Sequence, residues 1–158
     1  ALSNISDSFS YGPKNRIFQL FTPKIDRVVF AATKADQIVS GDHSSLVELL
    51  ESLVDHAYKT AQYEGVPPTA LAVSGVRSST EIEHDGEAAL SGFDANGASI
   101  GYIHPPIPSF ISKNTQRQEF EDWKIPKFNP PNVANDNQAV PHIRIDSVLQ
   151  TLVGDKCS

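Results

Sequence analysis

Two runs of consecutive apolar residues stand on either side of a segment in which apolar positions recur with a helical period. The first run covers residues 28–32 (VVFAA) and the second covers residues 69–73 (TALAV). Uninterrupted apolar runs are typical of parallel strands, which are buried on both faces of a sheet. The intervening apolar positions lie three or four residues apart and form one stripe: Leu46, Leu49, Leu50, Leu53, Val54, Ala57 and Ala61. This spacing predicts an amphipathic helix, and therefore a strand–helix–strand unit.

Capping residues mark the ends of the predicted helices. Asp42 or Ser44 would cap the start of the first helix, and Gly65, followed by two prolines, would end it. A second amphipathic pattern closes the chain, with apolar residues at Ile145, Val148, Leu149, Leu152 and Val153. Asp146 would cap this closing helix and Gly154 would stop it.

Residues 79–128 have no helical period and are rich in glycine, proline and β-forming residues. The segments 88–93 and 98–103 flank Asn96-Gly97, a dipeptide typical of hairpin turns. We therefore expect a small antiparallel insertion here. Three aromatic residues at its end, Phe120, Trp123 and Phe128, are interpreted as insertion core; the alternative is that they form a patch for a protein partner.

These patterns predict an α/β fold with four regions. Residues 1–78 form the α/β half and residues 79–128 form the antiparallel β insertion. Residues 129–140, which are rich in proline and asparagine, are a linker or surface loop, and residues 141–158 are a C-terminal helix that packs back on the α/β half. No internal repeat is visible.

Composition limits the possible partners and location. The 158 residues suffice for one domain with a modest core, and the formal charge of −6 argues against nucleic acid or an anionic membrane as partner. No apolar run approaches the roughly 18 residues of a membrane span. The single cysteine excludes an internal disulfide and fits a reducing cytoplasm. The five histidines share no metal-ligand spacing, so we predict no metal site in this chain.

The most informative polar residues follow the two predicted strands. Thr33-Lys34-Ala35-Asp36 comes directly after the first strand, and Ser74-Gly75-Val76 comes after the second. Loops at the carboxyl ends of parallel strands meet at one sheet edge, where ligands bind. A carboxylate there can accept two parallel hydrogen bonds from N1–H and the 2-amino group of guanine, and small residues let backbone amides approach the base. The alternative is an ordinary strand-to-loop turn in which Asp36 caps the next helix.

The chain resembles a known family at three places. They are residues 25–36 (IDRVVFAATKAD), residues 71–77 (LAVSGVR) and the ending, PHIRID at 141–146 with LVGDK at 152–156. These segments look like the YcjX-like P-loop NTPases, a family of bacterial cytoplasmic proteins associated with stress responses. The resemblance spans nearly the whole chain but only the carboxyl-terminal third or so of a full-length member. Ser74-Gly75 departs from the usual pattern of Ala or Ser followed by Ser or Ala, although both residues are small.

The resemblance implies a role for each loop residue. Asp36 would hold the guanine edge, Lys34 would cover the ring, and the Thr33 hydroxyl would hold the loop backbone. The amides around Ser74, Gly75 and Val76 would bind O6 of the base. The ligand would be GTP or GDP, with Mg²⁺ bound only in the intact parent, whose remaining chain is the expected partner.

This chain carries no Gly-x-x-x-x-Gly-Lys-[Ser/Thr] phosphate loop, so we expect no catalytic residue and no hydrolysis by these residues alone. Asp94-Ala95-Asn96-Gly97 matches the Asp-x-x-Gly of a switch loop but follows the base motif instead of preceding it, which favours a hairpin turn. Two other functions stay open. The chain could be a non-catalytic protein-interaction module, or the same fold could prefer ATP.

Overall fold

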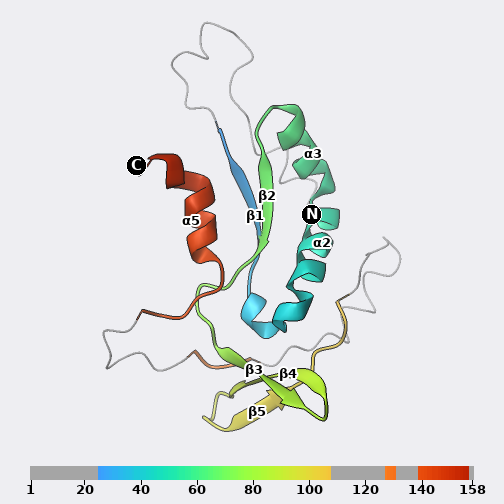
Figure 1. The fold of residues 1–158 in the computed structure, drawn as a ribbon, viewed down its shortest axis with the longest axis vertical. Helices are drawn as coiled ribbons and strands as arrows, with labels where there is room; N and C mark the ends of the chain where they lie inside the picture. Colours follow the sequence, from blue (N-terminus) through green and yellow to red (C-terminus); the bar gives the residue numbers. More distant parts are fainter. Residues whose placement is uncertain (1–24, 108–126, 131–138, 157–158) are drawn as a thin grey trace, which may run out of the picture.

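The computed structural model describes residues 25–107, 127–130 and 139–156 of the chain. It has a two-stranded parallel sheet with helices and a separate three-stranded antiparallel sheet (Figure 1). The elements are, in order, β1 (Val28–Ala32), η2 (Ala35–Gln37), η3 (Ser40–Asp42), α2 (His43–Leu53), α3 (Asp55–Tyr63), β2 (Pro68–Ala72), β3 (Ser79–His84), β4 (Glu87–Phe93), β5 (Ser99–Tyr102), α5 (Ile145–Val153) and η4 (Gly154–Lys156). The predicted α/β fold, with an antiparallel sheet and a closing helix, is confirmed.

The parallel sheet forms where the apolar runs predict it. β1 and β2 pair in register from Val28 opposite Pro68 to Ala32 opposite Ala72. Helices α2 and α3 lie along one side of this pair and α5 lies along the other (Figure 1). Arg27 holds α5 in place, because its guanidinium donates to the Thr151 carbonyl at 2.7 Å and pairs with Asp155 at 2.7 Å. Both strands end toward the antiparallel sheet, so the loops that follow them lie between the two sheets (Figure 1).

The amphipathic segment before β2 is two helices rather than the predicted one. Val54, at φ −105° and ψ 12°, interrupts the helical geometry between α2 and α3. Gly65, at φ +76°, follows the end of α3, as its sequence position predicts.

Asp42 stands at the N-cap of α2, as predicted, but makes no capping side-chain hydrogen bond. The Asp42 carboxylate lies 3.5 Å from Nε2 of His104 instead of bonding to the amides of the helix. The cap predicted for α5 is wrong, because Asp146 lies within the first turn and Arg144 is the N-cap residue, without a capping side-chain bond.

The antiparallel sheet has the strand order β3-β4-β5. The predicted hairpin across Asn96-Gly97 joins β4 to β5, closed by a hydrogen bond from the Asp94 amide to the Ala98 carbonyl at 2.9 Å. The Asp-x-x-Gly match is therefore a turn, as expected. A second tight turn at Asp85-Gly86, where φ is +52° and +82°, joins β3 to β4 and was not predicted from the sequence.

Two small apolar clusters bury adjacent residues of the segment that follows β1. Ile38 packs with Leu49 and Ile107, whereas its neighbour Val39 packs with Leu90 and Phe128. These adjacent residues therefore anchor one segment both to α2 and to the antiparallel sheet. The buried position of Phe128 agrees with its interpretation as core, whereas Phe120 and Trp123 lie outside the described residues.

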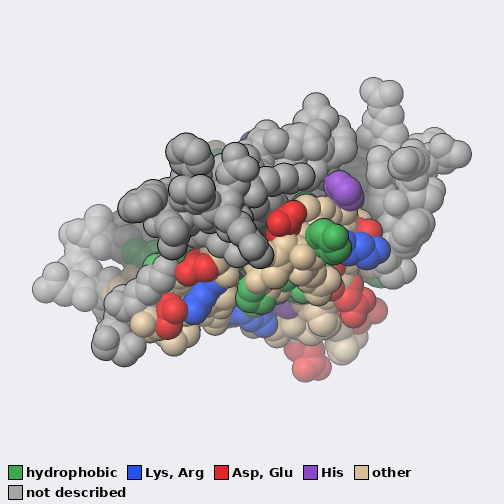
Figure 2. All heavy atoms as spheres, turned by 90° about the horizontal axis from the view of Figure 1, so that it is seen from above, with side chains coloured by type: hydrophobic (Ala, Val, Ile, Leu, Met, Phe, Trp, Pro, Cys, Tyr) green, Lys and Arg blue, Asp and Glu red, His purple; other side chains and the backbone are tan. Residues whose placement is uncertain are grey.

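One face of the molecule carries side chains of both charges. On the face shown in Figure 2, basic side chains lie beside acidic ones rather than in a patch of their own. No helix among residues 25–107, 127–130 and 139–156 has the length and apolar character needed to cross a membrane.

Candidate functional site

The turn after β1 is tied to the end of β2. The Val73 amide donates to the Ala32 carbonyl at 2.8 Å, and the Ala35 amide donates to the Val73 carbonyl at 3.0 Å. Between these bonds Lys34 adopts a left-handed backbone, with φ +64°, which turns the chain sharply into η2. The parallel register and this turn bring Asp36 beside the loop that follows β2.

Asp36 is nearly buried, with 5% of its surface exposed, and both of its carboxylate oxygens accept hydrogen bonds. The Ser74 hydroxyl donates to Oδ1 at 2.7 Å and the Ser78 amide donates to Oδ2 at 3.1 Å. The Ser79 hydroxyl donates to the backbone carbonyl of Asp36. Because each carboxylate oxygen has two lone pairs, these bonds orient the group and still leave acceptor capacity. No cation pairs with this carboxylate among the described residues.

The loop after β2 is held by the segment that leads into α5. Ser74 and Ile143 exchange two backbone hydrogen bonds, at 3.0 and 2.8 Å, and the Arg77 amide donates to the Pro141 carbonyl at 2.7 Å. The amides of Gly75 and Val76 make no hydrogen bond to a described residue, and both residues are exposed. The amides that remain for a ligand in this loop are therefore those of Gly75 and Val76, whereas the Ser74 amide is occupied.

The other residues predicted for the site are at the surface. Lys34 and Thr33 are exposed, and the Thr33 hydroxyl forms no hydrogen bond to the described part of the chain. The loop-holding role predicted for Thr33 is filled by the Ser79 hydroxyl and by the Ala35 amide. The rule that loops meet at the carboxyl edge correctly predicted that Asp36 lies close to Ser74. It did not identify Ser78 or Ser79 as hydrogen-bond partners of Asp36.

His43 is a buried residue of the site that the sequence pattern did not single out. Its Nε2 lies 2.9 Å from the Ala35 carbonyl and 3.2 Å from the Ile38 carbonyl, so this nitrogen carries the proton and donates. Its Nδ1 lies 3.0 Å from Nη1 of Arg144 and therefore accepts. Arg144 belongs to the His-Ile-Arg-Ile-Asp ending, but no local sequence signal joins it to His43, which is 101 positions away.

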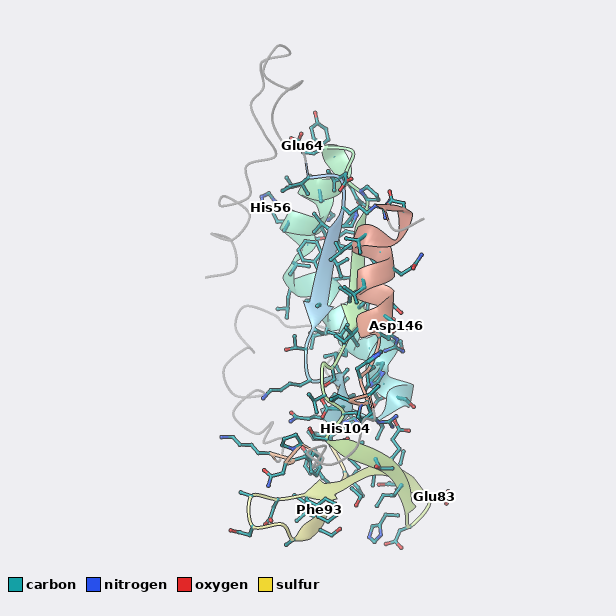
Figure 3. All side chains as sticks on the ribbon, turned by 90° about the vertical axis from the view of Figure 1, so that its left-hand side faces the viewer. His56, Glu64, Glu83, Phe93, His104 and Asp146 are labelled. Carbon is teal, nitrogen blue, oxygen red and sulfur yellow. The ribbon has the colours of Figure 1, made fainter. Side chains whose placement is uncertain are left out.

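The antiparallel sheet contacts the same turn through polar groups. The Val39 amide donates to Nε2 of His104 at 3.1 Å, and the Ser40 hydroxyl donates to the Glu81 carboxylate at 3.0 Å. Figure 3 shows His104 between the parallel sheet and the antiparallel sheet. A cavity of about 310 Å³ lies beside these contacts, lined in part by Asp36, Glu81 and Arg144. No group of His, Cys, Asp and Glu side chains suited to a metal ion occurs in the described ranges.

The fold and this site define an α/β protein in which two loops meet at the carboxyl edge of a parallel strand pair around one oriented carboxylate. The model of the YcjX-like family, DUF463, matches residues 1–157, so the chain belongs to that family, as its sequence predicts.

Two relatives are similar over almost the whole chain. The Ras-like GTPase YcjX of Escherichia coli (strain K12) is 33% identical over 160 residues, which are 99% of this chain and 34% of that protein. The Ras-like GTPase YcjX of Shewanella oneidensis is 33% identical over 169 residues, which are 99% of this chain and 33% of that protein. The chain thus spans about a third of the length of these curated relatives.

Proposed function

We propose that these residues form the guanine-recognition part of a YcjX-like GTPase. The observation that supports this function best is the Asp36 carboxylate, which is almost buried, oriented by two hydrogen bonds and not neutralised by a described cation. Such a group can accept from N1–H and the 2-amino group of guanine, whereas adenine offers an acceptor at N1 and no 2-amino group. A site of this kind rejects the wrong base by about 10⁴-fold.

The other loop residues complete the proposed site. The exposed amides of Gly75 and Val76 bind O6, and the Lys34 stem covers the base plane. The domain division predicted from the sequence is part of the proposal, with residues 1–78 as the base-binding half and 79–128 as the insertion. Hydrolysis requires the phosphate loop and Mg²⁺ of the intact parent, and these residues alone do not hydrolyse nucleotide. A cytoplasmic location and a role in a bacterial stress response belong to the same proposal.

Isothermal titration of the intact protein with GDP and ADP tests this function. Wild type binds GDP much more tightly than ADP, and Asp36→Ala removes that preference. Glu83→Ala, which removes an exposed carboxylate on β3, is the matched control and keeps the preference. Equal affinities for GDP and ADP in wild type, or no binding of either, contradict the proposal and favour a protein-interaction module. Tighter binding of ADP than of GDP favours the alternative that the same fold prefers ATP.

A further inference from the structure

Among the described residues, a polar side-chain link joins both base loops to the segment that leads into α5. It consists of His43, at the start of α2, and Arg144, directly before α5. We propose that Arg144, acting through His43, is a positioning residue that sets the spacing between Asp36 and the loop amides and so determines selectivity for guanine. This inference rests on the proposed function.

His43 fixes the turn that contains Asp36. Its Nε2–H donates to the carbonyls of Ala35 and Ile38, which stand on either side of Asp36 and Gln37 in the chain. The ring is 5% exposed, so water does not replace these bonds. The only nitrogen left, Nδ1, is an acceptor, and Arg144 supplies the donor. The orientation of the imidazole, and through it the turn, therefore depends on Arg144.

Arg144 fixes the second loop at the same time. Its Nη1 also lies 3.2 Å from the Ala72 carbonyl, at the end of β2 two residues before Ser74. Its chain neighbour Ile143 exchanges two backbone hydrogen bonds with Ser74. Arg144 thus contacts the end of β2 and the histidine that fixes the first loop, while its neighbour Ile143 aligns the loop that follows β2.

The backbone conformation supports a specific role for this arginine. The described residues other than glycine with positive φ are Lys34, Asp85 and Arg144. Asp85 lies in the β3–β4 hairpin turn, where such angles are usual. The other two flank the proposed base site, and an unfavourable conformation persists only when surrounding contacts impose it. At Arg144 those contacts are the bonds to His43 and Ala72.

Guanine selectivity is sensitive to this spacing because the base must contact both loops at once. If the loops shift, O6 and the 2-amino group cannot both be satisfied. Guanine then loses the bond of its 2-amino group, whereas hypoxanthine, which lacks that group, has no such bond to lose. The affinity ratio of GDP to inosine diphosphate therefore reports the spacing of the loops. Partial unfolding would lower both affinities by the same factor and leave the ratio unchanged.

The test measures this ratio by isothermal titration in the intact protein. Arg144→Gln should reduce the ratio at least fivefold, and Arg144→Lys, which keeps the charge but not the planar fork, should reduce it less. Arg27→Gln is the matched control, because Arg27 holds the same helix at its far end, through Thr151 and Asp155, away from both loops. It should leave the ratio within twofold of wild type.

His43→Gln and the double variant complete the experiment. If the two residues act through their mutual contact, His43→Gln lowers the ratio as Arg144→Gln does, and the double variant lowers it little further. An unchanged ratio in Arg144→Gln, or an equal fall in Arg27→Gln, overturns the inference while the GDP preference of wild type still stands. A wild type without GDP preference would instead overturn the proposed function itself.

Discussion

Asp36→Asn is the most specific perturbation of the proposed site, because the structure can accept it without rearrangement. The Ser78 amide must still donate, so the side-chain oxygen of the asparagine takes the Oδ2 position. The new amide nitrogen then takes the Oδ1 position beside the Ser74 hydroxyl, which can accept as well as donate. The folded state keeps both internal hydrogen bonds, and only the edge presented to the base changes.

The expected loss follows from those bonds. A carboxylate accepts from both N1–H and the 2-amino group, whereas the asparagine amide accepts at one position and presents a donor at the other. The loss of one hydrogen bond to a charged group, in a site that is 5% exposed, costs about 1.5–3 kcal/mol, and the loss of charge weakens the second bond. We expect a total of about 3 kcal/mol, or roughly 100-fold weaker GDP binding.

Isothermal titration of the intact protein with GDP and xanthosine diphosphate measures the change. Xanthine has an oxygen where guanine has its 2-amino group, so it can accept from the new asparagine amide, and the ratio of xanthosine diphosphate to GDP affinity should rise. Ser78→Ala is the control, since the bond to Asp36 comes from the backbone amide and survives that substitution. GDP binding by Asp36→Asn within threefold of wild type would refute the reasoning.

Two further predictions concern the antiparallel sheet. Gly92→Ala places a Cβ against the Phe128 ring, so it should lower the free energy of unfolding by about 1–3 kcal/mol in urea titrations, whereas Gly101→Ala on β5 meets nothing within 4 Å and should change it little; equal effects would contradict the packing. Backbone amides, above all that of Ala98, hold the pKa of the Asp94 carboxyl below its ordinary value of 3.8. The stability that Asp94 contributes is therefore present above its ordinary pKa of 3.8 and is lost as pH falls through the lower folded-state value. An NMR titration of Asp94 with its midpoint at or above 3.8 would count against this.

The strands and the pairing of the two base loops were predictable because they depend on local apolar runs and on a general rule of parallel sheets. The run at 28–32 became β1, and the shared carboxyl edge placed Asp36 at 2.7 Å from the Ser74 hydroxyl. The Asn96-Gly97 hairpin was equally local, since its turn chemistry lies within two residues.

The contacts that hold the site were not predictable, because their partners lie far apart in the chain. His43 has no sequence neighbour that marks it as buried, and its role depends on Arg144. The break at Val54 also left no signal, since the apolar stripe continues through it. The expected cap at Asp42 also failed, since this residue stands at the start of α2 but its side chain makes no bond to the helix amides.

The bridge between Ser74 and Ile143 has a consequence for biosynthesis. A ribosome that has just added Ser78 has made every residue of the proposed base site but not the backbone segment that aligns it. Nascent chains halted before residue 143 should therefore fold their strands without distinguishing one purine from another. Selectivity between nucleotides would therefore arise only once residue 143 has emerged and paired with Ser74.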